Sequence, residues 1–431
     1  MSISPAEYSQ RREQLMAKIG GGTAIFCSAP PAVMHNDVEY TYRQDSDFYY
    51  LTGFNEPSAV AVLAPHHRKH RFILFVQPKD PDQETWTGYR IGVEKAKAFY
   101  GADEAYSIEE LPEKLSQYLR NAERIFYHLG RDHQFNELIL AQWRELMKMY
   151  PRTGKAPIAL EDTNPLMYAM RIIKSEAEIN LMRKATQISA EAHKRAQEFA
   201  APGLYEYQVQ AEIEHYFRSH GAIGPAYPSI VASGANACIL HYIENNRQMQ
   251  AGDLLLIDAA CSYGYYNGDI TRTFPVNGKF TPEQQALYDI VLEAQLKAIE
   301  EVKPGKAYNE FHDMAVCVLV DGLLDLGLLK GNLEEIIKEE KYKPFYMHRT
   351  GHWLGLDVHD VGVYKHGDAW QPFQPGMIVT VEPGLYISPN IEPAAGQPEI
   401  PQHWRGIGIR IEDDVLVTAE GNDILTAAVS K

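Results

Sequence analysis

The chain has 431 residues, of which 45% are hydrophobic and 23% are charged. This length exceeds the size at which a single hydrophobic core stops growing, so we expect two domains, each with ample core. The formal net charge is −16, with acidic residues spread along the chain; such a field repels phosphate backbones and argues against nucleic acid as a partner.

Two further features concern the compartment. The first 18 residues are polar and charged, unlike a signal peptide, and no stretch approaches the roughly 18 uninterrupted apolar residues that span a bilayer. The four cysteines are far apart and form no C-x-x-C pair, which favours free thiols in a reducing compartment over disulfides or a zinc site. We therefore expect a cytoplasmic protein without a membrane partner.

The first part of the chain alternates short apolar runs with amphipathic stretches, a pattern typical of an α/β domain. The Gly20-Gly21-Gly22 run precedes a strand and lacks the Gly-Lys-Ser/Thr ending of a phosphate-binding loop, so we interpret it as a helix stop. The pattern predicts strands at 23–28, 59–64, 71–77 and 124–129, and helices at 6–18, 108–120 and 135–149.

Around residue 170 the pattern changes to pairs of longer helices. Ser175 with Glu178 predicts a capping box at the start of the first helix, and Thr281 with Gln284 repeats this start about a hundred residues later. In each case a Pro-Gly pair ends the helix, a second helix follows, and β-rich sequence comes next. We interpret residues 171–431 as an internal duplication with two αα-then-β halves.

Five residues of this second part have the chemistry of a two-metal site. Four carboxylates and one imidazole suit hard divalent cations such as Mn²⁺ or Mg²⁺ better than a structural zinc. Two such ions can hold a hydroxide between them and clamp a carbonyl under attack, so hydrolysis is the leading hypothesis. The candidates are Asp258 and Asp269 from the first half, and His352, Glu382 and Glu412 from the second.

The first two candidates can be placed on a hairpin. Residues 254–260 and 269–273 flank a segment rich in Tyr, Gly and Asn. With a turn centred on Tyr263-Gly264, Asp258 and Asp269 would lie directly opposite, with Cβ atoms about 5 Å apart. Two carboxylates so close repel each other unless a cation lies between them. The alternative is a pair of exposed loop aspartates.

Glu382 ends a predicted strand at 377–382, where a Pro-Gly pair stops it, although a Glu beside Pro-Gly is usually an ordinary turn residue. Arg410 and Glu412 lie two residues apart in a predicted strand at 408–417 and would share one face. The alternative for this pair is a buried ion pair without a metal.

Three histidines, His348, His352 and His359, fall within twelve residues. Gly351 and Gly355 lie among them and allow close backbone approach. This spacing in an apolar segment indicates a site and not scattered surface histidines. We expect His366 and His403, which lack such contexts, at the surface.

Taken together, these motifs resemble the aminopeptidase P (Xaa-Pro aminopeptidase) family of pita-bread metallopeptidases. The resemblance covers nearly the whole chain, although residues 365–374 match loosely and the proline-rich residues 387–405 are longer than the family's usual connection. The segments that carry it are HRTGHWLGLDVHD at 348–360, TVEPGLY at 380–386, GIGIRIEDD at 406–414, YRQDSDFYYLTGFNEP at 42–57 and RIIKSEAE at 171–178.

The resemblance implies an α/β N-terminal domain at residues 1–170 and a pita-bread catalytic domain with pseudo-two-fold duplication at 171–431. It implies hydrolysis of the bond between an N-terminal residue and a following proline, so the partners would be peptides with proline at the second position. It also implies two Mn²⁺ ions per subunit, or other divalent ions, with a metal-bridging hydroxide as nucleophile, in a homo-oligomer (dimer or tetramer).

Motif position implies individual roles. Asp258 would bind one ion, Asp269 and Glu412 would bridge both, and His352 and Glu382 would complete the ligand set. Glu382 would also be the general base, His359 would hydrogen-bond the developing oxyanion, and His241 would hold the scissile peptide. Three further residues would orient the substrate or support the site: His348, Tyr386 and Arg410.

Two alternatives stay open from the sequence. Prolidase, a dipeptidase of the same fold, would require a free carboxylate after proline. A non-catalytic pita-bread module that binds other proteins would be expected to lose ligands, whereas all five candidates are present.

Overall fold

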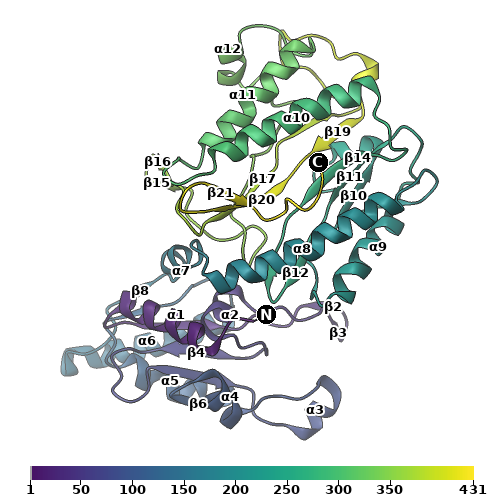
Figure 1. Ribbon diagram of the computed structural model, residues 1–431. Coiled ribbons are helices and arrows are strands. Elements are labelled where there is room, and N and C mark those ends of the chain that lie inside the picture. The colour runs from purple at the N-terminus through teal and green to yellow at the C-terminus, as the bar shows by residue number, and fades with distance from the viewer. Residues whose placement is uncertain (1) are drawn as a thin grey trace. The chain divides into compact units, whose positions relative to one another are not determined.

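The computed structural model describes residues 2–431, which divide into two compact units at residue 168. Figure 1 traces each unit in chain order. All four cysteines are free thiols, as predicted. Within residues 2–431, no helix combines the length and the apolar composition needed to cross a membrane.

The first unit is built on a six-stranded mixed sheet in the order β6-β5-β4-β1-β7-β8. Its core joins sheet residues such as Ile25 and Phe75 to Leu115 and Ile139 on two helices. Every strand and helix predicted for this part is present, with shifted ends. Gly20 ends the first helix at φ +55°, and its N–H donates to the Met16 carbonyl oxygen, which confirms the predicted helix stop.

The helices and strands of this part have the following bounds: α1 (Pro5–Ile19), α2 (Ser46–Thr52), α3 (Pro81–Thr87), α4 (Val93–Tyr100), α5 (Leu111–Leu119), α6 (His133–Thr153), α7 (Asn164–Arg171), β1 (Thr23–Cys27), β2 (Val33–His35), β3 (Val38–Glu39), β4 (Val60–Leu63), β5 (Phe72–Val76), β6 (Glu104–Ser107), β7 (Arg124–Phe126) and β8 (Ala159–Glu161). Residues 108–110 form a 3-10 turn ahead of α5.

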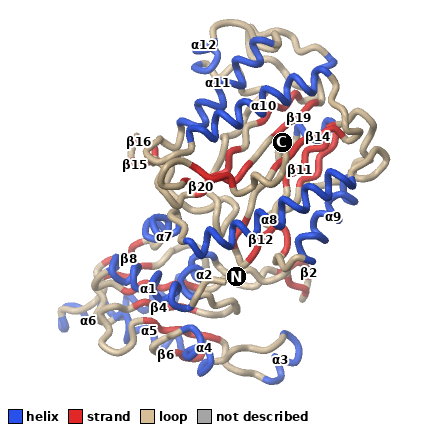
Figure 2. Tube along the Cα trace, in the orientation of Figure 1, coloured by secondary structure: helices blue, strands red, loops and turns tan. Residues whose placement is uncertain are grey.

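The second unit contains two helix pairs, each followed by strands. The first helix of each pair begins at the predicted capping box: Ser175 and Glu178 bond reciprocally at one start, and Thr281 and Gln284 do so at the other. In Figures 1 and 2 strands such as β11, β14 and β19 lie between the two helix pairs. This arrangement confirms the predicted duplication of two αα-then-β halves.

The strands of each half pack against the helices of that half. Sheet β10-β11-β14 packs on the first helix pair through residues such as Ile188 and Ile257. Strands β18 and β19 pack on the second pair through residues such as Leu319 and Ile409, and sheet β17-β20-β21 adds a third cluster around Trp353. The strands of the two halves therefore meet between the two helix pairs.

The elements of the second unit have the following bounds: α8 (Glu176–Phe199), α9 (Glu206–Ser219), α10 (Pro282–Glu301), α11 (Glu310–Asp325), α12 (Leu333–Lys338), β9 (Gly224–Pro225), β10 (Ile230–Ser233), β11 (Leu254–Asp258), β12 (Cys261–Tyr263), β13 (Tyr266–Asn267), β14 (Thr271–Pro275), β15 (Lys365–His366), β16 (Ala369–Trp370), β17 (Ile378–Val381), β18 (Gly384–Ile387), β19 (Ile407–Arg410), β20 (Asp413–Val417) and β21 (Asn422–Ile424).

A buried histidine on α8 leads to a prediction about acid stability. His193 is fully buried, and its Nε2 lies 2.8 Å from the Ala259 carbonyl oxygen. Burial lowers the pKa of His193 to about 4, so the folded chain binds this proton less readily than the unfolded chain. The stability that the neutral ring contributes is therefore complete above pH 6.5 and is lost as pH falls toward 4.

We expect the wild type to lose about 2 kcal/mol more stability than His193→Gln between pH 7 and pH 5, because glutamine can keep the bond to Ala259 without titrating. Urea unfolding followed by tryptophan fluorescence, in metal-free buffer at both pH values, measures this difference. Equal losses in the two proteins would show that His193 contributes nothing to the acid sensitivity.

Candidate metal centre

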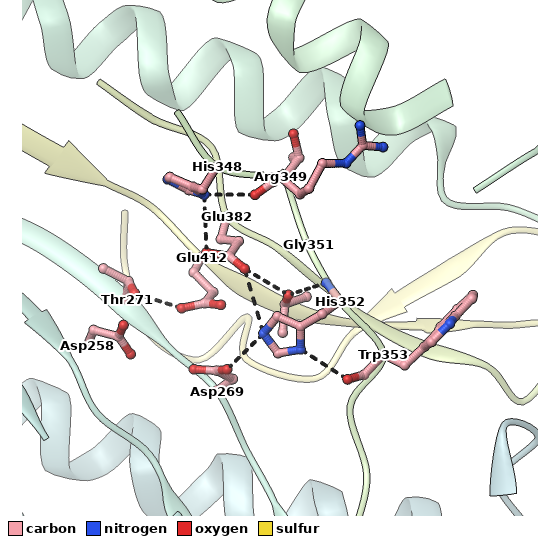
Figure 3. Close-up of polar contacts among 12 residues, drawn as sticks. Asp258, Asp269, Thr271, His348, Arg349, Gly351, His352, Trp353, Glu382 and Glu412 are labelled. Carbon is pink, nitrogen blue, oxygen red and sulfur yellow. Dashed lines mark hydrogen bonds and ion pairs between the residues drawn. The ribbon is translucent and has the colours of Figure 1, made fainter. Parts of the chain in front are cut away.

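The predicted site residues gather around one cavity of about 1080 Å³ in the second unit. Tyr386 is the exception: it lies behind the wall, where it contacts His348 and Arg410. Figure 3 shows the His352 ring in contact with Asp269 and Glu382, with Glu412 and Asp258 on the same side of the ring as Asp269. The predicted residues that line the cavity are Asp258, Asp269, His352, Glu382, Glu412, His241, His348, His359 and Arg410.

The hairpin that carries the two aspartates is present, but its predicted register is wrong. Asp258 lies opposite Thr271, and the turn is centred on Gly264-Tyr265. Both turn residues have positive φ, +56° and +75°. Hairpin turns of this kind favour Gly in the second central position, and for this reason the sequence indicated a turn at Tyr263-Gly264. In the structure the second central position is occupied by Tyr265 instead. Asp269 is therefore a diagonal neighbour of Asp258 on the same face.

A tyrosine hydroxyl joins these two aspartates. Tyr227 Oη lies 2.6 Å from Asp258 Oδ1 and 2.5 Å from Asp269 Oδ1. Because a hydroxyl carries one proton, it can donate to only one carboxylate at a time. The two acidic groups are thus held close together on the buried side of the cavity.

The predicted continuous strand at 408–417 is also wrong, because the chain changes sheet within it. β19 pairs with β18 and β20 pairs with β17, and the two residues between them, Ile411 and Glu412, belong to neither strand. Glu412 N–H instead donates to the Thr271 carbonyl oxygen. The apolar alternation continues through this break, so the sequence gives no signal of it. Arg410 and Glu412 nevertheless both reach the Thr271 hydroxyl.

His352 lies at the centre of the group. Its Nδ1 is 3.0 Å from the Trp353 carbonyl oxygen, which leaves Nε2 facing Asp269 Oδ2 at 3.4 Å and Glu382 Oε1 at 3.6 Å. Gly351 makes this geometry possible, because a Cβ there would collide with the Thr380 carbonyl oxygen. The predicted close backbone approach at Gly351 is confirmed.

The electrostatics of the group favour a bound cation. Burial and the neighbouring charges of Asp269 and Glu382 raise the pKa of Glu412 well above its usual value, and burial raises the pKa of Glu382 to about 7. Burial opposes protonation of His352, yet contact with Asp269 and the charge of Glu382 raise its pKa to about 9. A divalent ion would replace that proton and relieve the repulsion between carboxylates.

The donor set also fits a metal geometrically. Ligand atoms of Asp269, His352 and Glu412 all lie within 4.8 Å of one another. Asp258 and Glu382 stand beside this group and line the same cavity. Three or four oxygens with one imidazole nitrogen match the preference of hard divalent cations.

Behind the ligands, a chain of hydrogen bonds links the two halves. Arg410 Nη2 donates to Asp258 Oδ2 at 2.6 Å, and its Nη1 donates to the Tyr386 hydroxyl at 3.1 Å. That hydroxyl lies 2.8 Å from His348 Nε2, and His348 Nδ1 lies 2.8 Å from the Arg349 carbonyl oxygen. Burial lowers the pKa of His348 to about 3, so its ring is neutral and accepts from Tyr386.

The loop that carries His359 is held by a buried ion network. His359 faces the ring of His352 at a centroid separation of 4.3 Å. The next residue, Asp360, accepts from Arg171 Nη2 at 2.5 Å and from Lys174 Nζ at 3.0 Å. Burial alone would raise the pKa of Asp360, but these two cations hold it below its usual value.

Tyr227, Thr271 and Lys174 are parts of the site that the sequence did not reveal as such. Thr271 could have been found, because it lies two residues after Asp269 on the same strand face. Tyr227 and Lys174 lie far from their partners in the chain, and their local sequence resembles that of ordinary core residues. His366 and His403 are exposed, as predicted.

Comparison with known proteins gives two family matches. Residues 180–419 match the model of metallopeptidase family M24. Residues 8–127 match the model of the aminopeptidase P N-terminal domain. The two matches fall on opposite sides of residue 168, where the structure divides.

Among characterised proteins, the chain is 45% identical to the Xaa-Pro aminopeptidase of Escherichia coli over 100% of this chain and 96% of that protein. It is 34% identical to human Xaa-Pro aminopeptidase 3, over 100% of this chain and 84% of that protein. The solved structure of Pseudomonas aeruginosa aminopeptidase PepP superposes with a TM-score of 0.95 at 46% identity, covering 100% and 96% of the two chains. Zinc-substituted E. coli aminopeptidase P in complex with product gives 0.94 at 44% identity, covering 100% and 97%.

Proposed function

Because this chain belongs to metallopeptidase family M24 and, within it, to the Xaa-Pro aminopeptidases, we propose that it removes the N-terminal residue from peptides with proline at the second position by using two Mn²⁺ ions. The enzyme is a metallopeptidase, and family membership implies divalent metal ions. The observation that carries the proposal is the cavity in which five candidate ligands converge, three of them with ligand atoms within 4.8 Å.

The proposed ligands are Asp258, Asp269, His352, Glu382 and Glu412. Asp258 would help to hold one ion, while Asp269 and Glu412, whose ligand atoms lie within 4.8 Å of each other and of His352, would help to hold both. Once bound, the ions would provide a shared hydroxide as nucleophile at neutral pH and would polarise the scissile carbonyl. The E. coli aminopeptidase P of similar structure was solved with zinc substituted into it and with product bound. The site of that relative therefore accepts a divalent ion other than Mn²⁺.

The side chains around the ligands supply the other steps. Glu382 faces the centre of the group and would accept the proton of the attacking water. His359, on the loop beside His352, would donate to the carbonyl oxygen as negative charge develops there. His241, exposed on the cavity wall, would hold the scissile peptide, while His348, Tyr386 and Arg410 keep Asp258 and the cavity wall in position.

The proline at the second position explains why a dedicated enzyme is needed. A peptide bond that precedes proline has no N–H, and the ring fixes φ near −65°. Recognition by an added β-strand, which needs main-chain hydrogen bonds, therefore fails at this bond. A closed, acidic site that grips the free amino end avoids that requirement.

The domain assignment forms part of the proposal. We propose residues 1–170 as the aminopeptidase P-type N-terminal domain and residues 171–431 as the catalytic domain, supported by the two compact units. We also propose a homo-oligomer, dimer or tetramer. The four free thiols support a reducing compartment, for which we propose the cytoplasm.

The direct test uses Arg-Pro-Pro and Arg-Pro with metal-stripped protein, alone and with Mn²⁺, Mg²⁺ or Zn²⁺. We expect arginine release from the tripeptide only when metal is added, with the highest rate in Mn²⁺, because the ligand set is rich in oxygen. Cleavage of the dipeptide alone would instead identify a prolidase. Failure to cleave either peptide with any of these ions would favour a non-catalytic binding module.

A further inference from the structure

Two cations stand at the exposed end of the cavity, beside an indole ring. Arg349 and Lys365 are exposed and line the cavity together with Trp370. Lys365 Nζ lies 4.0 Å from the centroid of the Trp370 ring, and Arg349 Cζ lies 5.4 Å from it. Within residues 2–431, neither cation has a carboxylate oxygen within 4.0 Å. Their charges are therefore not neutralised by a neighbouring acid, in a protein whose net charge is −16.

These side chains are held by their surroundings and are not loose surface groups. Lys365 lies directly across the β15–β16 hairpin from Trp370. Arg349 donates from Nη2 to Asn309 Oδ1. A cation over an aromatic face is attracted by the ring quadrupole, so Trp370 draws both cations toward the same part of the cavity lining.

The hairpin is also connected to the ligand segment. Trp370 lies 6.3 Å from the ring centroid of Tyr308, with the two planes at 26°. The Tyr308 hydroxyl donates to the Gly351 carbonyl oxygen at 2.7 Å, and Gly351 directly precedes His352. Trp370, which both cations face, is therefore linked through Tyr308 to the segment that carries His352.

Most acidic residues of the cavity are buried, whereas the two basic residues are exposed. The cavity therefore has an acidic inner end and a basic outer end. Asp269 and Glu412 are only 5% and 2% exposed, whereas Arg349 and Lys365 are exposed. The amino end of a peptide is a cation, so it is attracted to the acidic inner end. An aminopeptidase holds one residue on that side of the cleaved bond, so the peptide from proline onward extends toward the exposed end.

We propose that Arg349 and Lys365 bind an anionic group of the peptide on the carboxyl side of its proline, and so set a substrate preference of this enzyme. The inference rests on the proposed function. The anion has two possible sources with the same chemistry: the free α-carboxylate of a short peptide, or an acidic side chain in a longer one.

The test compares kcat/KM for matched peptides in saturating Mn²⁺. Arg-Pro-Gly and its C-terminal amide test the α-carboxylate, while the amides Arg-Pro-Gly-Glu and Arg-Pro-Gly-Gln test the side chain. We expect the wild type to prefer at least one anionic member about three- to fivefold, the range of an exposed ion pair. The preference should reside in KM and should shrink at 1 M salt.

The double variant Arg349→Gln/Lys365→Gln should cleave the neutral peptides as the wild type does and should show no preference for the anionic ones. Lys330→Gln is the matched control, because Lys330 is exposed in the same unit and does not line the cavity; it should keep the preference. Equal kcat/KM for all matched pairs in the wild type, or a preference that survives in the double variant, would overturn the inference. If the wild type cleaved none of these peptides, the proposed function itself would fail.

Discussion

Replacing Glu382 with glutamine is expected to lower kcat for Arg-Pro-Pro about a thousandfold, which lies within the range that a positioned general base contributes. Glutamine has nearly the same size and can still donate or accept hydrogen bonds, but it cannot take up a proton at neutral pH. Glu382 Oε1 lies 3.6 Å from His352 Nε2, on the side of the cavity where the candidate ligands meet. The rate of arginine release by the Mn²⁺-loaded enzyme measures the effect.

Because Glu382 is also a proposed ligand, bound manganese must be measured in the same samples by atomic emission. Glu392→Gln makes the same chemical change at an exposed position in residues 387–405 and should leave kcat unchanged. A Glu382→Gln enzyme that bound manganese fully and kept its kcat within threefold would rule out the base role. Loss of manganese together with activity would assign Glu382 to metal binding instead.

Replacing Asp360 with asparagine is expected to destabilise the folded chain by about 3–5 kcal/mol, the cost of breaking a buried ion pair from one side. The change removes the negative charge that faces Arg171 and Lys174, whose side chains are only 3% and 1% exposed. Arg171 would keep its contact with Asp357 Oδ2 at 2.8 Å, whereas the buried Lys174 would lose the carboxylate oxygen that its Nζ contacts at 3.0 Å. Urea unfolding monitored by tryptophan fluorescence gives the change in midpoint.

The same substitution should lower kcat in whatever protein remains folded, because Asp360 follows His359 and anchors its loop. Asp321→Asn, at an exposed position in α11 without an ion pair among the described residues, is the control and should change stability by less than about 0.5 kcal/mol. If Asp360→Asn unfolded at the same urea concentration as Asp321→Asn, the network would be structurally unimportant.

The sequence predicted the parts of the fold whose signals are local. Capping boxes at Ser175 and Thr281 are reciprocal bonds between residues three apart, so the residue types alone indicate them. The same holds for the αα-then-β repeat, because Pro-Gly pairs and apolar periodicity mark where each helix ends. The candidate ligands were recognised because each stands in a short, unusual context, such as Glu382 beside Pro-Gly.

What could not be predicted depends on contacts between distant segments. The hairpin register was missed because Tyr265 adopts φ +75°, a conformation that local chemistry disfavours for a tyrosine. The break at Glu412 was missed because it is imposed by pairing with two different sheets and leaves the apolar pattern intact. Tyr227 and Lys174 take their positions from partners that lie far away in the chain, and a single sequence contains no record of those pairings.

The candidate ligands come from two separate halves of the catalytic domain, and this affects how the stability of the folded enzyme depends on metal. Ions bound as proposed would act as reversible crosslinks between segments that are distant in the chain, in a place where bare carboxylates push the halves apart. Binding of this kind increases the free energy of unfolding in proportion to the logarithm of the free ion concentration. The increase is about 2.7 kcal/mol when that concentration is a hundred times the dissociation constant. Thermal stability and the lifetime of the folded protein would therefore rise and fall with the concentration of free metal. A shortage of manganese would lower the amount of folded enzyme as well as its activity.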